Sequence, residues 1–415
     1  MPEDQDKKFD KRLLIIFMIQ FTEVLGFSSV MPIIPFLGLS LGLNAFQVGL
    51  ILSIFSICQL FASPITGKLS DRFGRKPLLL FSQTSTLIGF FLLGIANNVW
   101  ILVAARLVDG LLGSNMTVAQ AYISDVTNPK YRTKTFGYSS AVFGAGLVFG
   151  PVIGGILSTI NYSVPMFFAA GVSLLSIILV LIFLPESLNK KERENKLDFK
   201  FGDIIPIKET KRFFKSVKIR GTLVVFFIYT FGFFLFITTF ALFAKKQINV
   251  GVQEVSFYMA WIGILRVIFQ SALINPLLKK LSENTTLKLG IFAMIFTMTF
   301  LIFSNNYWIV YIPISFLAFG SGVVRPILTS KLTKAVKREE TGSLLGVNNA
   351  LISIGQIITP IFGGFILQFL PPQTLPIISA VIFALIFILW RWAFVKPIQE
   401  EKEPVIKSKE QVIAS

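Results

Sequence analysis

The chain contains no histidine and only one cysteine, Cys58, among its 415 residues. Histidine-based metal sites and proton relays are therefore excluded, and one cysteine cannot form an internal disulfide or a cysteine cluster. Charge is also scarce, since charged residues make up only 15% of the chain. Any proton relay must use carboxylates, so the few acids inside apolar segments are informative.

Hydrophobic residues make up 53% of the chain, and the mean hydropathy is +0.72. So few charges cannot cover an apolar core in water, whereas a lipid bilayer solvates apolar surface. The net charge of +17 does not indicate nucleic-acid binding, because basic residues form short clusters between apolar runs. We therefore expect the lipid bilayer, and not a nucleic acid, as a partner of this chain.

The apolar runs predict about twelve membrane-spanning helices of about 20 residues each. They are Leu13–Leu37, Gln47–Thr66, Pro77–Ile95, Trp100–Ser124, Thr135–Ile160, Val164–Leu184, Gly221–Phe243, Val255–Leu278, Leu287–Phe303, Tyr307–Ser330, Gly342–Leu367 and Thr374–Phe394. The first run is too long for the apolar part of a signal peptide. The sequence has no ATP-binding lysine motif, nucleophile elbow or metal cluster, so neither an enzyme nor a metal site is expected.

Basic side chains are concentrated in alternate connections, which indicates that these connections face the cytoplasm. The basic connections are Lys68–Lys76, Lys130–Lys134, Lys190–Arg220, Lys279–Lys288 and Lys331–Arg338. The other connections are uncharged, with Lys245 and Lys246 as the exception. We expect a multi-pass protein of the plasma (inner) membrane with both termini in the cytoplasm, which requires an even number of spans.

The chain divides into two similar halves, 1–187 and 221–415, joined by a basic cytoplasmic linker at 188–220. Five small or kinking residues of the fifth span reappear at one constant offset in the eleventh: Gly137, Gly146, Pro151, Gly154 and Gly155 as Gly346, Gly355, Pro360, Gly363 and Gly364. Duplication of this kind predicts an all-α membrane protein made of two pseudo-symmetric six-helix bundles. The substrate cavity is expected between them, near the middle of the membrane.

The second span is followed by Gly67-Lys-Leu-Ser-Asp71-Arg72-Phe-Gly74-Arg75-Lys76. Glycine permits a tight turn at the membrane surface, and an aspartate among cations can form an ionic cluster. The segment resembles motif A of the Major Facilitator Superfamily, which implies that Asp71, with Arg75 and Asp125 as partners, helps to hold one face of a transporter closed. The alternative is that the basic residues only anchor the topology. In the second half, Lys280 takes the position of Asp71.

The fourth span contains Leu102-x3-Arg106-x2-Asp109-Gly110, which resembles motif B of the drug exporters in that superfamily. A charge in the middle of a span costs about 2.5–3.5 kcal/mol, so both side chains are expected to face protein or water. Arg106 and Asp109 are three residues apart and lie on one helix face, where they can pair. The alternative is a purely structural ion pair. Drug exporters often carry glutamine where this chain has Asp109.

The fifth span has glycines and a proline at the spacing of motif C, which marks the antiporter branch: Gly137, Gly146, Gly150, Pro151, Gly154 and Gly155. Small residues let helices approach closely, and proline bends a span without exposing its backbone to lipid. The resemblance implies export rather than uptake. Helix packing alone is the alternative, since the eleventh span has the same pattern with Thr359 in place of the glycine before Pro360.

The first span carries Gln20 and Glu23 on one face and ends in a Pro-x-x-Pro pattern. At the rise of an α-helix, Glu23 lies roughly 15 Å into an apolar core about 30 Å thick, near the depth of Asp109. Two acids at one depth beside Arg106 predict a proton and cation site, because desolvation favours the neutral form of a carboxyl group. The alternative for Glu23 is a hydrogen-bonded packing residue.

The second half contributes Arg266 in the eighth span, Arg325 in the tenth, and Asn348 and Asn349 in the eleventh. Arg266 can either bind an anionic group or pair with Glu23 across the cavity. The two asparagines are expected to line the same cavity. Arg325 lies near the cytoplasmic end, where it either serves the cavity or extends to the membrane surface.

Together these motifs are similar to those of the twelve-span drug:proton antiporters, the tetracycline and multidrug exporters. The resemblance implies a monomer that exports small hydrophobic or cationic molecules by alternating access. It would use the proton gradient, with no cofactor, and its partners would be protons and a small-molecule substrate. Two alternatives remain: proton symport or facilitated uptake of a sugar, amino acid or organic anion, and a membrane sensor that transports nothing.

Overall fold

The computed structural model describes residues 11–128, 131–188, 206–337 and 340–395, and the regular structure within these ranges is entirely helical. Eleven helices in the described ranges are long and apolar enough to cross a membrane. A further apolar helix, α17 (Thr374–Ile388), is shorter and is followed by the π-helical turn η4 (Arg391–Val395). The predicted all-α membrane architecture is confirmed.

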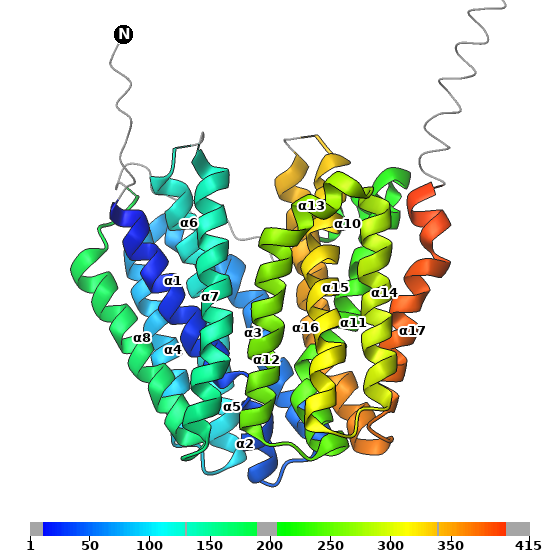
Figure 1. The fold of residues 1–415 in the computed structure, drawn as a ribbon. Helices are drawn as coiled ribbons and strands as arrows, with labels where there is room; N and C mark the ends of the chain where they lie inside the picture. The colour runs from blue at the N-terminus through cyan, green and yellow to red at the C-terminus, as the bar shows by residue number, and fades with distance from the viewer. Residues whose placement is uncertain (1–10, 129–130, 189–205, 338–339, 396–415) are drawn as a thin grey trace, which may run out of the picture. The chain divides into compact units, whose positions relative to one another are not determined.

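The first compact unit comprises Met1–Ile204 together with Val250–Gly263. Its helices are α1 (Lys11–Val30), α2 (Ile34–Ser40), α3 (Ala45–Phe73), α4 (Arg75–Gly94), α5 (Val99–Leu112), α6 (Asn115–Val126), α7 (Arg132–Ser158) and α8 (Ser163–Phe183). Helix α1 packs against α7 and α8, and α4 packs against α5 and α8 (Figure 1). Ile16, Leu79 and Tyr122 are fully buried in a core that joins α1, α4 and α6.

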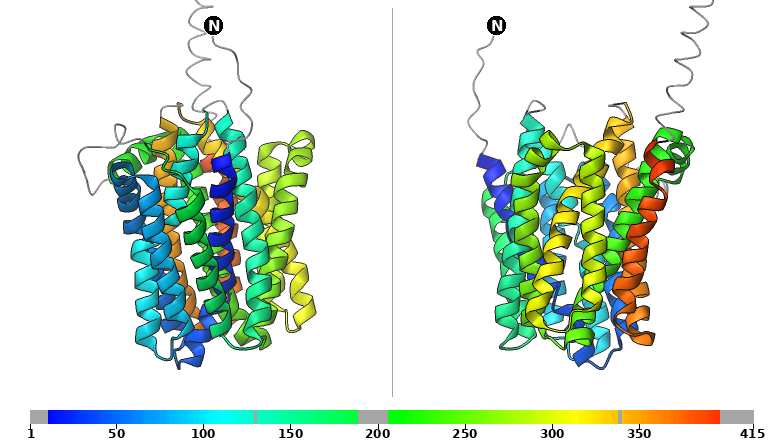
Figure 2. Two further views of the ribbon diagram at one scale, coloured as in Figure 1. Left: turned by 90° about the vertical axis from the view of Figure 1, so that its left-hand side faces the viewer. Right: turned by 45° about the vertical axis from the view of Figure 1, so that its right-hand side comes forward.

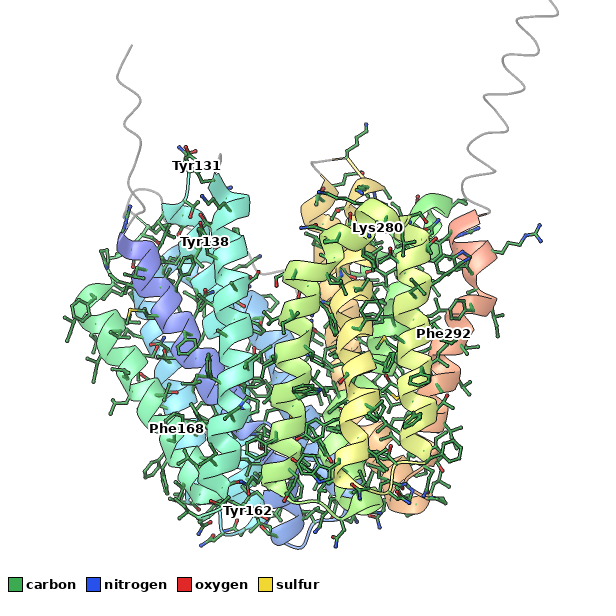
Figure 3. The ribbon with its side chains drawn as sticks, in the orientation of Figure 1. Tyr131, Tyr138, Tyr162, Phe168, Lys280 and Phe292 are labelled. Atoms are coloured by element: carbon green, nitrogen blue, oxygen red, sulfur yellow. The ribbon has the colours of Figure 1, made fainter. Side chains whose placement is uncertain are left out.

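The second unit comprises Ile205–Asn249 and Ile264–Ser415. Its helices are α10 (Ile207–Lys215), α11 (Val217–Ile248), the end of α12 (Val252–Ile268), η2 (Phe269–Leu273), α13 (Ile274–Lys280), α14 (Glu283–Ile302), α15 (Tyr307–Lys334), α16 (Thr341–Phe369) and α17. Helix α11 packs against α16 and α17, and α14 packs against α15 and α17 (Figure 2). Phe292 of α14, labelled in Figure 3, is 62% exposed, as an apolar side chain on a lipid-facing surface would be.

Three predicted spans are interrupted where continuous helices were expected. The first span turns at Met31–Ile33, where proline removes a backbone donor, and continues as α2. The fourth span breaks between α5 and α6, at Gly113 and Ser114. The eighth span loosens into the π-helical η2 directly after Ile268. Helix α10 lies in a segment that was predicted only as a polar linker.

Candidate functional site

The break in the fourth span lies beside both predicted acids. Asp109 is in the last turn of α5, and the backbone N–H of Gly113 donates to the Asp109 carbonyl at 2.8 Å. Helix α6 then starts at Asn115, a buried polar residue. Broken helices at membrane depth are tolerated where protein surrounds them, and they are common at transporter binding sites. The break therefore directs polar groups inward.

Glu23 and Asp109 are joined by two polar side chains from other helices. The Asn115 amide Nδ2 donates to Glu23 Oε1 at 2.6 Å and to Thr86 Oγ1 at 2.9 Å. The Thr86 hydroxyl donates in turn to Asp109 Oδ1 at 2.9 Å. We call Glu23, Asn115, Thr86 and Asp109 the acid chain. It runs from α1 through α6 and α4 to α5, so all four helices must be packed before it exists.

The orientation of the Asn115 amide is determined by a neighbour. The Ser82 hydroxyl of α4 donates to Asn115 Oδ1 in a short hydrogen bond, so the amide nitrogen faces Glu23 and Thr86. The break itself is held by α3, because Gln59 Nε2 donates to the Gly113 carbonyl at 2.9 Å. Carbonyls freed by a helix break need such partners, since unsatisfied backbone groups are costly in a membrane.

Arg106 lies at the end of the acid chain. Its guanidinium is 3.9 Å from Asp109 Oδ2 and stacks over the Phe55 ring at 5.6 Å from the centroid. Both Arg106 and Asp109 are 3% exposed, and Arg106 Nε and one terminal nitrogen have no hydrogen-bond partner within the described chain. The second Glu23 oxygen, Oε2, also has no partner there. The site thus retains an unused acceptor and unused donors.

Gly113 permits the close approach of the acid chain to the break. A Cβ atom at this position would lie 2.7 Å from Asp109 Oδ1 and 2.9 Å from Thr86 Oγ1. Neither oxygen could stay in place beside it, because such distances are shorter than van der Waals contact. The added Cβ would also overlap the Asp109 carbonyl oxygen, so the end of α5 and the acid chain both require glycine here.

Three of the polar residues predicted for the cavity, namely Gln20, Asn348 and Asn349, are not part of the acid chain. Gln20 joins α1 to α7, because its Oε1 accepts from the Ser139 hydroxyl at 2.9 Å. In the second unit, Asn348 is buried with Oδ1 unpartnered within the described chain, whereas Asn349 is exposed. Glu23 and Arg266 belong to different units, and their pairing stays a prediction.

The motif A residues form an ionic cluster at the junction of α3 and α4. The Arg75 guanidinium contacts Asp71 Oδ1 at 2.5 Å and donates to Asp125 Oδ2 at 2.9 Å and to Ser70 Oγ at 2.6 Å. Gly74 joins the two helices with φ of 103°, a conformation that favours glycine. Asp71, Arg75 and Asp125 are the partners that the resemblance implied, and we call them the Arg75 cluster.

The remaining motif A residues lie around this cluster. Arg72 stacks over the Phe73 ring at 5.4 Å, and Lys76 Nζ donates to the Leu181 carbonyl at 3.0 Å. Gly67 faces α6, since a Cβ atom there would lie 3.6 Å from a methyl carbon of Thr117. These three residues support the helix junction without entering the ion pairs.

Glu186 adds a carboxylate to this junction, which the sequence analysis did not single out. It accepts from the backbone N–H groups of Arg75 at 2.9 Å and Lys76 at 3.2 Å, the first two residues of α4. Carboxylates are favourable at a helix N-terminus because free N–H groups and the helix dipole face them there. Ser187 extends the link by donating to Asp125 Oδ2 at 2.9 Å. The segment after α8 is thereby tied to the Arg75 cluster.

Three of the motif C glycines, Gly146, Gly150 and Gly154, lie along the contact of α7 with α1. The Gly146 carbonyl accepts from the Ser28 hydroxyl at 2.8 Å, and a Cβ atom at Gly150 would overlap Ser28 Oγ. At Gly154 the added Cβ would overlap the Ser29 carbonyl oxygen, and at Gly155 it would lie 2.6 Å from the Cβ of Ser256. Pro151 is buried inside α7 without ending it. Gly137, by contrast, has nothing within 4 Å of an added Cβ.

Comparisons with known proteins agree with the resemblance seen in the motifs. The family model described as Major Facilitator Superfamily matches residues 16–350 and 271–414. The class H tetracycline resistance protein of Pasteurella multocida is 29% identical over 87% of this chain and 90% of its own length. The quinolone resistance protein NorA of Staphylococcus aureus (strain COL) is 25% identical, over 86% and 89%.

Solved structures of low sequence identity share the fold. The nucleoside transporter NupG has a TM-score of 0.76 at 14% identity, covering 92% of this chain and 99% of that one. The human organic anion transporter MFSD10 has a TM-score of 0.67 at 18% identity, covering 92% and 100%. At such identities the likeness concerns the fold alone.

Proposed function

The chain belongs to the Major Facilitator Superfamily, a family of membrane transporters and not of enzymes, and we propose that it exports small hydrophobic molecules in exchange for protons. The transport would follow alternating access in the plasma (inner) membrane, with both termini in the cytoplasm. The observation that carries the proposal is the acid chain, in which Asn115 and Thr86 connect two buried carboxyl groups.

Two buried acids joined by hydrogen bonds are suited to accept and release a proton. An ionised carboxyl group only accepts hydrogen bonds, whereas a protonated one also donates, so each proton transfer rearranges the bonds around it. The unused oxygen of Glu23 and the unused donors of Arg106 leave room for that rearrangement. Acids are rare in membrane spans and commonly mark proton pathways.

The proton gradient supplies the driving force in this proposal. An inward membrane potential contributes about 2.3 kcal/mol per charge for each 100 mV. Loading of a proton neutralises one carboxyl group of the acid chain, and release on the other side restores its charge. Substrate and proton would thus compete for binding to the same state of the transporter. Such competition is what exchange requires.

The Arg75 cluster supports the gating part of the proposal. It joins α3, α4 and α6 through charge-assisted hydrogen bonds, and Glu186 adds the segment after α8. We assign it to holding the cytoplasmic end of the first unit closed. Opening this end would separate charged partners. Hydrogen bonds between charged groups are stronger than those between neutral groups, so they are suited to holding a gate closed. The tight packing of α1 on α7 through Gly146 and Gly150 is consistent with the antiporter branch.

The test uses Glu23→Gln and Asp109→Asn in reconstituted vesicles with an imposed proton gradient. A panel of lipophilic compounds is scored for uptake into the vesicles and for accompanying proton release. We expect each variant to lose gradient-driven exchange by about 100-fold, because neither amide can take up a proton. Glu254→Gln serves as the matched control and should transport normally, since among the described residues Glu254 accepts only from the Gly251 backbone N–H.

Normal gradient-driven export by both acid variants would contradict the proposal. The direction of transport separates the main alternative, because a symporter would accumulate labelled substrate in cells that an exporter would exclude. If the unaltered protein transports none of the compounds at any proton gradient, the result would favour a membrane sensor that transports nothing.

A further inference from the structure

The second unit has two arginines in apolar spans, and neither is paired with a carboxylate of the residues that the structure describes. Arg266 lies near the end of α12, and Arg325 lies within α15. The acids among the described residues of this unit are Glu209, Glu283 and Glu340, each at the start of a helix. Glu283 pairs with Lys331 and Lys334, and Glu340 pairs with Arg212. None of these acids is paired with Arg266 or Arg325.

The two arginines line one cavity that is formed entirely by the second unit. Its other walls are Tyr229, Thr230, Phe233 and Phe234 of α11 and Ile352 of α16. Neither guanidinium has a hydrogen bond or an ion pair with any residue that the structure describes. Arg266 is half-buried and Arg325 is exposed, so two positive groups line a mostly aromatic cavity with their donors unused by the described residues.

Tyr229 brings a further donor to the same place. The residue is 3% exposed, and its ring stacks on Phe233 at a centroid distance of 6.2 Å and meets Phe226 edge to face at 6.4 Å. Its hydroxyl makes no hydrogen bond to the described chain. Tyr229 lines the cavity, so its hydroxyl adds a donor to those of the two arginines.

The backbone around Arg266 lies next to a π-helical turn and close to the neighbouring helix α15. The π-helical η2 begins three residues after it, and such turns occur frequently at functional sites. On the facing helix, a Cβ atom at Gly322 would lie 3.5 Å from the Arg266 carbonyl oxygen, so α12 and α15 lie close together here. The position of Arg266 is thus set by two helices rather than by a mobile loop.

We propose that this cavity binds the anionic end of an amphipathic organic acid, with its aromatic or aliphatic part against Phe233 and Phe234. A carboxylate accepts two parallel hydrogen bonds from one guanidinium group, so either arginine can hold it in a bidentate manner. The inference rests on the proposed export function and narrows its substrate class. Cationic compounds, which the sequence resemblance included, would be repelled by two arginines.

Binding can be tested without any proton gradient, using the full-length protein in lipid nanodiscs. The fluorescent probe is 1-pyrenebutyrate, compared with its methyl ester and with a pyrene-butyl trimethylammonium salt. We expect the acid to bind about tenfold more tightly than the ester, and the cation to bind more weakly than either. Arg266→Gln and Arg325→Gln should each weaken binding of the acid by about tenfold and leave the ester unchanged.

Arg220→Gln is the matched control, because Arg220 stacks over Trp392 outside the cavity and should not affect binding of the acid. Equal affinity for acid and ester, tighter binding of the cation, or unchanged binding of the acid by both cavity variants would overturn the inference. Glu23→Gln separates the two proposals, because it should abolish proton exchange while binding of the acid persists. If the unaltered protein binds pyrenebutyrate but exchanges nothing for protons, only the proposed function fails.

Discussion

The two units repeat one pattern of glycines and prolines, yet they carry opposite charges in their spans. The first unit holds Glu23 and Asp109 in a hydrogen-bonded chain, with Arg106 beside it. The second unit presents Arg266 and Arg325 to an aromatic cavity, and its described spans hold no acid beyond their first residue. The repeated pattern of glycines and prolines thus carries different charged residues in its two copies, and our two proposals assign the proton to the first unit and the anionic cargo to the second.

The same contrast appears at the ends of the helices. In the first unit, Asp71 pairs with Arg75, whereas the second unit has Lys280 at the matching position. Lys280, labelled in Figure 3, is the last residue of α13 and forms no ion pair with the residues that the structure describes. The junction of α13 and α14 is instead paired through Glu283, which contacts Lys331 and Lys334 of α15, so the two units hold this place together with different ion pairs.

The largest expected effect comes from cutting the acid chain without removing an acid. Asn115→Ala deletes the amide that joins Glu23 to Thr86 and leaves both without that buried partner. We expect gradient-driven transport in vesicles to fall by about 100-fold, since stranding buried polar groups costs about 1–3 kcal/mol.

Gln83→Ala is the matched control for that variant. It removes another buried amide of the same unit, one that bonds to Ser176 and not to the acid chain. If the two variants lose transport equally, the acid chain has no special role, and the contrast between the units loses its basis.

A smaller effect is expected from Gly150→Ala in the contact of α7 with α1. The added methyl group would overlap Ser28 Oγ and lie 2.8 Å from the Leu25 carbonyl oxygen. Overpacking of this kind destabilises by about 1–3 kcal/mol, so the melting temperature measured in detergent should fall.

Gly137→Ala in the same helix meets no atom within 4 Å and should leave the melting temperature nearly unchanged. The second unit sharpens this comparison, because a Cβ atom at Gly355, the counterpart of Gly146, has its nearest neighbour at 3.7 Å. Gly355→Ala should therefore be tolerated. If it lowers the melting temperature as much as Gly150→Ala does, the two units do not differ in how tightly these glycines are packed.

A weaker effect is expected from Asp71→Asn. The Asp71 side chain is 37% exposed, so its ion pair with Arg75 contributes at most about 1 kcal/mol. We expect the open population of this end of the first unit to rise about fivefold, measured by spin-label distances between α3 and α6 in nanodiscs. Lys280→Gln should not change the corresponding distances in the second unit, and a comparable opening there would show that the two junctions are equivalent.

The smallest effect is expected from Glu186→Gln. The amide keeps one acceptor oxygen but loses the charge that faces the N-terminus of α4, where Arg75 and Lys76 donate. Such a charge is worth about 0.3–1 kcal/mol, so thermal unfolding should shift slightly downward, and less at high salt. If the shift in unfolding temperature does not depend on salt concentration, Glu186 stabilises the junction by packing rather than by its charge.

Much of the architecture follows from the sequence because a bilayer constrains it strongly. Backbone groups in lipid must bond within their own segment, so runs of about 20 apolar residues become helices whatever surrounds them. The ionic partners of Arg75 were also predictable, since the motif places Asp71 one helical turn away and Asp125 matches a usual partner. Residue counting also predicted that Glu23 and Asp109 lie at a similar depth, and in the structure two polar side chains are enough to link them.

What the tertiary structure alone decided is how the acids communicate. Asn115, Thr86 and Ser82 come from α6 and α4, and nothing in the spacing along either segment indicates that they meet Glu23 of α1. Helical periodicity assigns a residue to a face, but the axial shift and rotation between neighbouring helices depend on packing over their whole length. The break at Gly113, the cap at Glu186 and the cavity of Arg266 and Arg325 have the same origin, because each needs contacts between helices that no single segment contains.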